Sequence, residues 1–216
     1  MPSIGRLWRI TMLQSVANRR PLKSRSTVWA TALTRLMLRT PITPNTVSVL
    51  GIGFAALGAI AFLLAPGGWG WWVAAVLCIQ LRLIANLLDG LIAVEGGRFS
   101  PTGAMFNEFP DRIEDSLLLV AAGYAAGQPT LGWCAALLAM GTAYVRALGG
   151  ALGQPQDFAG PMAKQHRMAA LSLGAVASAF VPYALTVALA VIASGTALTI
   201  VRRLMRLARG LQETSR

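Results

Sequence analysis

Three long stretches without a charged residue constrain the fold of this chain more than any other feature of its sequence. They lie between Arg39 and Arg82, between Asp115 and Arg146, and between Arg167 and Arg202. An apolar run of about twenty residues is long enough to cross a bilayer as a helix, in which the backbone satisfies its own hydrogen bonds. Because 55% of the 216 residues are also hydrophobic, we predict an all-α, polytopic integral membrane protein rather than an ordinary soluble domain.

Six segments are predicted to cross the membrane, separated by turns rich in glycine and proline. The predicted spans are 46–65, 71–94, 105–126, 130–150, 166–182 and 184–206. We expect them to form one membrane domain, residues 41–208. A basic N-terminal segment, 1–40, is expected before this domain, and a short cytoplasmic tail, 209–216, after it.

Basic residues at both ends predict the orientation of the chain. The first forty residues hold eight Lys or Arg and no acid, and the part from Arg202 onwards holds five Arg against one Glu. Cytoplasmic flanks carry such an excess, so both termini are expected on the cytoplasmic side of the plasma (inner) membrane, which agrees with an even number of spans. The net charge of +11 then reflects contact with anionic lipid headgroups rather than with nucleic acid.

An amphipathic juxtamembrane helix is expected before the first span. In residues 27–39, helical spacing places four apolar side chains on one face: Trp29, Leu33, Leu36 and Met37. The apolar stripe of residues 5–17 is poorer, and a frayed basic tail is an equal alternative there. Thr43 and Pro44 follow, as the predicted N-cap and first residue of the first membrane helix.

The stretch 86–115 holds six of the eight acidic residues of the chain, between segments that are almost purely apolar. One predicted helix carries Asn86 and Asp89, and the next carries Asn107 and Asp111. Spacings of three and four place each pair on one helix face. If the two helices pack side by side, four oxygen-bearing side chains converge near the membrane surface. Such a set suits Mg²⁺, Mn²⁺ or Ca²⁺ rather than zinc.

This stretch resembles the signature of the CDP-alcohol phosphatidyltransferase family, D-x2-D-G-x2-A-R-x8-G-x3-D-x3-D. Five positions match it with the right spacing: Asp89, Gly90, Ala93, Gly103 and Asp111. Three positions depart from it: Asn86 and Asn107 replace aspartates, and Val94 replaces the arginine. The resemblance covers roughly residues 40–170, and it implies a homodimer, because members of this family commonly form one.

The resemblance implies an enzyme of phospholipid biosynthesis. Its donor would be a CDP-alcohol such as CDP-diacylglycerol, which gives its phosphatidyl group to the hydroxyl of a small or lipid alcohol and releases CMP. A divalent metal would neutralise the diphosphate, while a carboxylate takes the hydroxyl proton. The implied metal ligands are Asn86, Asp89, Asn107 and Asp111. Asp111 is also the implied general base, and Asp115, one turn further and outside the signature, is its rival.

The two asparagines remove two negative charges from the expected metal site. Amide oxygens bind Mg²⁺ or Mn²⁺ less strongly than carboxylates do. We therefore expect one tightly held ion, with any second ion weak or brought in by the substrate diphosphate.

Two further groups of residues are expected to contact the substrates. The donor group consists of Thr43, Asn45, Gly90, Ala93, Arg98 and Gly103. In this group Thr43 and Asn45 also have a plain role at a helix start, and Arg98 would substitute for the missing arginine four residues earlier. The phosphate and acceptor group consists of Arg146, Lys164 and Arg167. Basic side chains beside a membrane also set topology without any further role.

Several observations leave other interpretations open. Arg82 either snorkels towards the interface or neutralises the acidic residues or a substrate phosphate. Arg112 and Glu108 are spaced to pair on one helix face. The loss of two aspartates also supports a non-catalytic relative that binds lipid or a partner protein. A transport protein would need polar residues deep inside several spans, whereas here they gather at one side.

Overall fold

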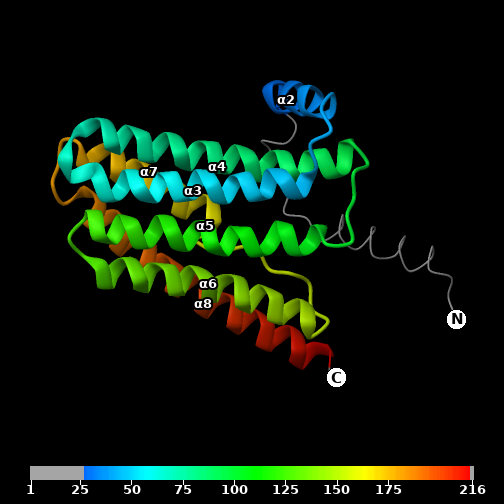
Figure 1. Cartoon of the computed structure of the whole chain (residues 1–216). Helices are drawn as coiled ribbons and strands as arrows, with labels where there is room; N and C mark the ends of the chain where they lie inside the picture. The colour runs from blue at the N-terminus through cyan, green and yellow to red at the C-terminus, as the bar shows by residue number, and fades with distance from the viewer. Residues whose placement is uncertain (1–26, 215–216) are drawn as a thin grey trace, which may run out of the picture.

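The computed structural model describes residues 27–214, and helices make up its regular structure. The elements are α2 (Val28–Leu38), α3 (Pro44–Leu64), η2 (Ala65–Gly67), α4 (Trp69–Glu95), α5 (Gly103–Ala125), α6 (Pro129–Ala151), α7 (Lys164–Ser178) and α8 (Ala184–Thr214) (Figure 1). The described residues contain no strand, which confirms the all-α prediction. Each of the six predicted spans coincides with one of the helices α3 to α8. The helix considered for residues 5–17 lies outside the described residues.

Among the described residues, four segments are long and apolar enough to cross a membrane: 44–67, which joins α3 to η2, and the helices α4, α6 and α8. α5 has the length of a span but carries five charged residues between positions 108 and 115. α7 has 15 residues, about 22 Å at 1.5 Å per residue, which is shorter than a hydrocarbon core of about 30 Å. The chain is therefore a membrane protein with several apolar helices, and six spans stay a prediction.

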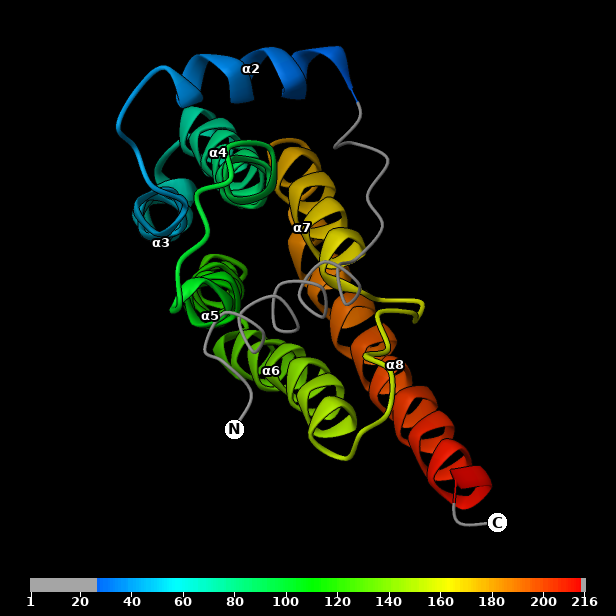
Figure 2. The same cartoon turned by 90° about the vertical axis from the view of Figure 1, so that its right-hand side faces the viewer.

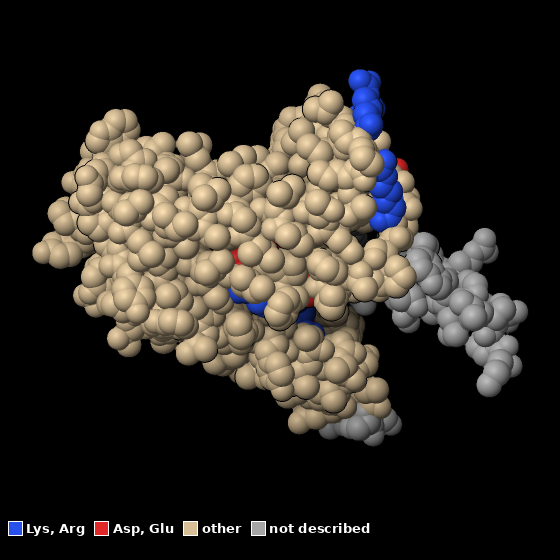
Figure 3. Space-filling model, viewed as in Figure 1, with Lys and Arg blue, Asp and Glu red and all other residues tan. Residues whose placement is uncertain are grey.

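Helices α3 to α8 pack as a closed ring, which we call the helix ring. α3 contacts α4 and α5, α5 contacts α6, α6 contacts α8, α8 contacts α7, and α7 returns to α4 (Figure 2). Small residues permit close packing at the turn between α5 and α6, where a Cβ on Gly123 would lie 2.6 Å from the Cα of Gly132. Each helix of the ring thus turns one side towards a shared interior. In Figure 3, charged residues appear at one end and in a narrow opening near the middle, while uncharged residues cover the rest of the described surface on this face.

α2 lies crosswise at the end of the ring where α3 begins (Figures 1 and 2). Leu33 and Met37 pack on a buried cluster that includes residues of α3 and α4, and Ala30 is buried against α4. Trp29 and Leu36, which the sequence places on the same apolar face, are 48% and 55% exposed. The predicted face is therefore divided: Leu33 and Met37 pack on the ring, whereas Trp29 and Leu36 are turned towards the surroundings.

α8 runs without a break from Ala184 to Thr214. The described part of the predicted tail, residues 209–214, is therefore helical. Basic residues near the end of α8 thus stand on the same continuous helix that forms part of the ring.

Candidate active site

A network of buried charges joins α4, α5 and α7 inside the helix ring. Arg82 of α4 has a fully buried side chain, with its Nε 2.5 Å from Glu114 Oε2 and its Nη2 2.5 Å from Asp115 Oδ1. Arg167 of α7 lies 2.8 Å from the other oxygen of Asp115. Burial of an ion costs several kcal/mol unless it is paired. Of the two roles considered for Arg82, the structure supports neutralisation of the acidic residues rather than snorkelling.

Asp111 lies next to this network, one turn before Asp115 on α5. Lys164 pairs with Asp111 Oδ1, and Arg82 Nη2 is 3.7 Å from the same oxygen. Asn86 donates from Nδ2 to Asp111 Oδ1 at 2.7 Å and to Glu114 Oε2 at 2.9 Å. Asn86 therefore bridges two carboxylates of α5 from its position on α4.

Lys164 begins α7, outside the four candidate spans. Burial lowers the pKa of its ammonium group, and so does the nearby guanidinium of Arg82, while Asp111 and Asp115 oppose this shift. The ammonium group is thus held between a cation and two anions, which fixes its place at the edge of the network.

Asp89 lies near the same group but has a different environment. Ser48 of α3 donates from Oγ to Asp89 Oδ2 at 2.7 Å, and Asp89 interacts electrostatically with Asp111 and Lys164. The other oxygen, Asp89 Oδ1, is buried and has no hydrogen-bond partner among residues 27–214. A buried carboxylate oxygen without a donor is costly, and a bound cation would satisfy it.

The expected metal ligands fit a hard cation in part. Asp89 and Asp111 supply carboxylates in one region of the ring, and Asn86 can offer only its amide oxygen because its nitrogen is already a donor. Asn107 is exposed on α5. Within the described part of the chain, no three His, Cys, Asp or Glu side chains are grouped to hold a metal ion. Two carboxylates with amide oxygens suit one divalent ion better than two.

The expected donor residues lie mainly at the end of the ring where α3 begins. Thr43 caps α3 as predicted, because its Oγ1 accepts a hydrogen bond from Thr46 N at 3.2 Å. Asn45 Nδ2 donates to Thr102 Oγ1 at 3.1 Å, which joins the start of α3 to the α4–α5 loop. The remaining small residues of this group are half-buried: Gly90, Ala93 and Gly103.

Arg98 binds the backbone of the segment between α2 and α3. Its guanidinium donates to the carbonyl oxygens of Leu38, Thr40 and Ile42 at 3.1, 2.8 and 2.7 Å. The guanidinium group, which the sequence suggested as a substitute for the signature arginine, is occupied by these three bonds. In this structure Arg98 therefore positions α2 relative to the ring.

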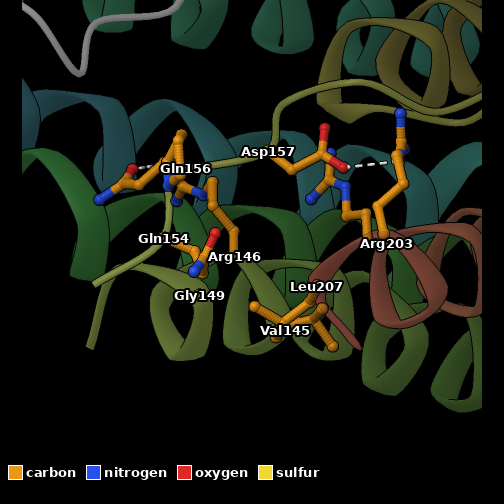
Figure 4. Close-up of a pocket in the computed structure, with 10 residues that line it drawn as sticks. Val145, Arg146, Gly149, Gln154, Gln156, Asp157, Arg203 and Leu207 are labelled. Atoms are coloured by element: carbon orange, nitrogen blue, oxygen red, sulfur yellow. Dashed lines mark hydrogen bonds and ion pairs between the residues drawn. The ribbon is translucent and has the colours of Figure 1, made fainter. Parts of the chain in front are cut away.

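A second polar region opens between α6, α8 and residues 152–163. A cavity of about 320 Å³ is lined by Arg146, Arg203, Arg206 and Asp157, among others (Figure 4). Arg206 Nε lies 2.9 Å from Asp157 Oδ2. Three cations facing one carboxylate give this cavity a positive charge. The expected phosphate group is thus divided, because Arg146 lines the cavity whereas Lys164 and Arg167 contact the acidic residues of α5.

Contacts across long sequence distances explain what sequence reasoning missed. Ser48 contacts Asp89, 41 residues away, and Glu114 contacts Arg82, 32 residues away. Helical spacing within one segment cannot indicate such pairs. Arg203 was counted with the basic tail, yet it is 6% exposed and donates to Thr142 O at 2.8 Å. The expected pairing of Arg112 with Glu108 is also replaced. The carboxylate of Glu108 pairs with Arg146, and Arg112 donates weakly to the backbone oxygen of Glu108 at 3.4 Å.

No family model matches the sequence, but individual proteins are similar to it over most of its length. The phosphatidylinositol phosphate synthase of Corynebacterium glutamicum is 31% identical over 180 residues, which cover 79% of this chain and 80% of that protein. The phosphatidylinositol phosphate synthase of Streptomyces avermitilis is 29% identical over 196 residues, 83% of this chain and 78% of that protein. The bifunctional IPC transferase and DIPP synthase of Rubrobacter xylanophilus is 36% identical over 180 residues, 81% of this chain but 39% of that protein.

The fold is similar to crystal structures of phosphatidylinositol phosphate synthase from Mycobacterium tuberculosis. The structure with CDP-DAG bound has a TM-score of 0.71 at 25% identity and matches 82% of this chain and 92% of that one. The complex with manganese and citrate has a TM-score of 0.71 at 24% identity, with 82% and 87% matched. The likeness therefore extends over most of the helix ring.

Proposed function

Because the chain belongs to the CDP-alcohol phosphatidyltransferase family, we propose that it transfers the phosphatidyl group of CDP-diacylglycerol to the hydroxyl of an acceptor alcohol and releases CMP. It is a metal-dependent membrane transferase of phospholipid biosynthesis. The observation that carries this function is the placement of Asp89 and Asp111 in one region inside the ring, where an oxygen of Asp89 has no donor among residues 27–214. Both aspartates occupy positions of the family signature.

A divalent metal, when bound, would neutralise the donor diphosphate and the departing CMP. Asp89 and Asp111 are its proposed carboxylate ligands, with Asn86 and Asn107 as weaker amide ligands. One tightly held Mg²⁺ or Mn²⁺ is expected, and a second ion would be weak or arrive with the diphosphate. The manganese in the related Mycobacterium tuberculosis structure supports a divalent cofactor.

The contacts favour Asp111 over Asp115 as the general base. Asp115 has a side chain that is 3% exposed, and two guanidinium groups hold it at 2.5 and 2.8 Å. Such a carboxylate is enclosed on both sides and offers a substrate no access. Asp111 is also paired with cations, Lys164 and Arg112, but its side chain is 16% exposed, so an acceptor hydroxyl can reach it. Asp115 then has a positioning role, in which it orients Arg82 and Arg167.

The acceptor proposed for this chain is a phosphorylated polyol of the inositol phosphate class. The names of the similar proteins support this class, and the cavity of Arg146, Arg203 and Arg206 offers cations for its phosphate. Lys164 and Arg167, beside the acidic residues, would lie closer to the donor diphosphate. Thr43, Asn45, Gly90, Ala93 and Gly103 form the proposed wall of the nucleotide site, and Arg98 positions that wall.

Six spans complete the proposed topology, with both termini and the site on the cytoplasmic side of the plasma membrane. α5 can take part because its charged side chains face partners inside the ring, which reduces the cost of placing them in a bilayer. A homodimer is proposed by analogy with the family.

A non-catalytic relative that binds lipid or a partner protein is the second candidate. It is favoured by the two asparagines, because they weaken the attraction of the site for metal. It predicts binding of CDP-diacylglycerol without metal-dependent CMP release.

The test is CMP release by the purified protein in lipid nanodiscs, with CDP-diacylglycerol and a panel of alcohols, with and without Mg²⁺ or Mn²⁺. We expect turnover that requires the metal. Asp89→Ala and Asp111→Asn should each lower it by at least about 100-fold, because they remove a metal ligand or the base. Glu213→Gln, an exposed change on α8, should leave turnover unchanged. Absence of CMP with every alcohol and metal would favour the non-catalytic relative.

A further inference from the structure

Arg82 places a permanent cation among the carboxylates of the candidate site. The carboxylates are Asp89, Asp111, Glu114 and Asp115, and the cations within their reach are Arg82, Arg112, Lys164 and Arg167. We call these eight side chains the charge cluster. With all eight ionised, four negative charges face four positive ones, so the charge cluster is neutral before any metal binds.

Arg82 lies close to a proposed metal ligand as well as to Asp115. Its Nη2 lies between Asp115 Oδ1 at 2.5 Å and Asp111 Oδ1 at 3.7 Å. Asp111 is a proposed metal ligand, so the guanidinium and a bound cation would compete for the same carboxylate. At a few ångströms in a low-dielectric interior, like charges repel strongly.

Asn86 and Glu114 hold Arg82 in this position. Glu114 accepts from Arg82 Nε at 2.5 Å and from Asn86 Nδ2 at 2.9 Å. An aspartate at position 86 would have no hydrogen to donate and would face two carboxylates at these distances. The asparagine is therefore matched to Glu114, and Gly51 of α3 gives Glu114 room, because a Cβ there would lie 2.5 Å from Oε1.

We propose that Arg82, held by Glu114 and Asn86, is a built-in counter-charge that limits the candidate site to one divalent ion. One divalent ion would bring the charge cluster to a net charge of two positive, and a second would bring it to four positive in a buried environment. The inference rests on the proposed function, since the ion is taken to serve phosphatidyl transfer. The number of bound ions is nevertheless measurable without turnover.

The test is a titration of purified, donor-free protein with Mn²⁺, in which electron paramagnetic resonance measures free Mn²⁺. Wild-type protein should bind one ion per chain. Arg82→Met removes the counter-charge at similar length, so it should bind Mn²⁺ at least about tenfold more tightly or take up a second ion. In the matched control Arg82→Met/Glu114→Gln the net charge returns to its original value, and affinity and ion number should return to those of the wild type.

A second variant covers the case in which Arg82→Met fails to fold. Glu114→Gln removes a carboxylate outside the proposed ligand set and leaves Arg82 in place, so Mn²⁺ affinity should fall by at least about tenfold. Two ions bound by the wild type, or unchanged binding in the folded variants, would overturn the proposal. CMP release separates the two claims. Protein that binds one ion without turnover contradicts only the transfer function, and protein that turns over with two ions contradicts only the role of Arg82.

Discussion

At the scale of single residues, two aspartates one helical turn apart differ in their exposure. Asp115 is enclosed by Arg82 and Arg167, whereas Asp111 also pairs with a cation, Lys164, but is partly exposed. Their order along α5 is visible in the sequence, but the difference between them arises from helices that lie far away in the chain.

Asp115→Asn should therefore destabilise the fold more than it impairs chemistry. It leaves two buried guanidinium groups without their shared partner, a loss of about 3–5 kcal/mol for a broken buried ion pair. Thermal unfolding in detergent should show a clearly lowered melting temperature, while folded protein below that temperature keeps measurable CMP release. Asp111→Asn should show the reverse pattern, with a small change in melting temperature and a large loss of turnover. A stable Asp115→Asn protein without turnover would instead identify Asp115 as the base.

At the scale of elements, α3 contributes space beside the charge cluster but no charged side chain. Gly51 faces the charge cluster, where a Cβ would lie 2.5 Å from Glu114 Oε1, but a Cβ on Gly53 would meet nothing within 4 Å. Both glycines stand inside one helix, two residues apart, so they form a natural pair for comparison.

Gly51→Ala should lower stability and Gly53→Ala should not. Alanine favours a helix by up to about 1 kcal/mol over glycine, which Gly53→Ala gains without a clash. In Gly51→Ala the carboxylate of Glu114 must move away from Arg82, and that displacement outweighs the gain. Melting temperatures of the two variants measured side by side test this, and equal melting temperatures would show that Glu114 can relocate at no cost.

At the scale of the whole molecule, two regions of charged side chains lie in the same ring. The charge cluster holds four carboxylates against four cations, and the cavity between α6 and α8 is lined by three arginines and one aspartate. Glu108 and Arg146 form an ion pair between α5 and α6, next to both regions. This arrangement supports the proposal that a donor and an anionic acceptor bind at separate, adjoining sites.

A phosphorylated polyol should accordingly be a better acceptor than the same polyol without phosphate. Arg206→Ala removes a cation from the cavity and should raise the KM for the phosphorylated acceptor by about tenfold, with a smaller effect on kcat, because loss of a charged contact weakens binding. Arg209→Ala, an exposed change one turn further along α8, is the control. Kinetics with both acceptors measure this difference, and an equal KM for the two acceptors in the wild type would contradict a phosphate site in the cavity.

Local patterns in the sequence determined the helices of this protein. Apolar stretches of about twenty residues predict α3, α4, α6 and α8 because hydropathy and length act within one segment. The Thr43 cap and the spacing of Asn86 with Asp89, and of Asn107 with Asp111, are likewise local, because each spans at most four residues.

Only the tertiary structure decided which charges meet. Arg82 and Glu114 are 32 residues apart, and Lys164 and Asp111 are 53 apart. Such pairs depend on how whole helices are rotated and stacked, which helical periodicity within a segment leaves open. For the same physical reason Arg82 could be read from the sequence as either a snorkelling or a neutralising residue. Its burial among carboxylates from another helix made it part of the charge cluster.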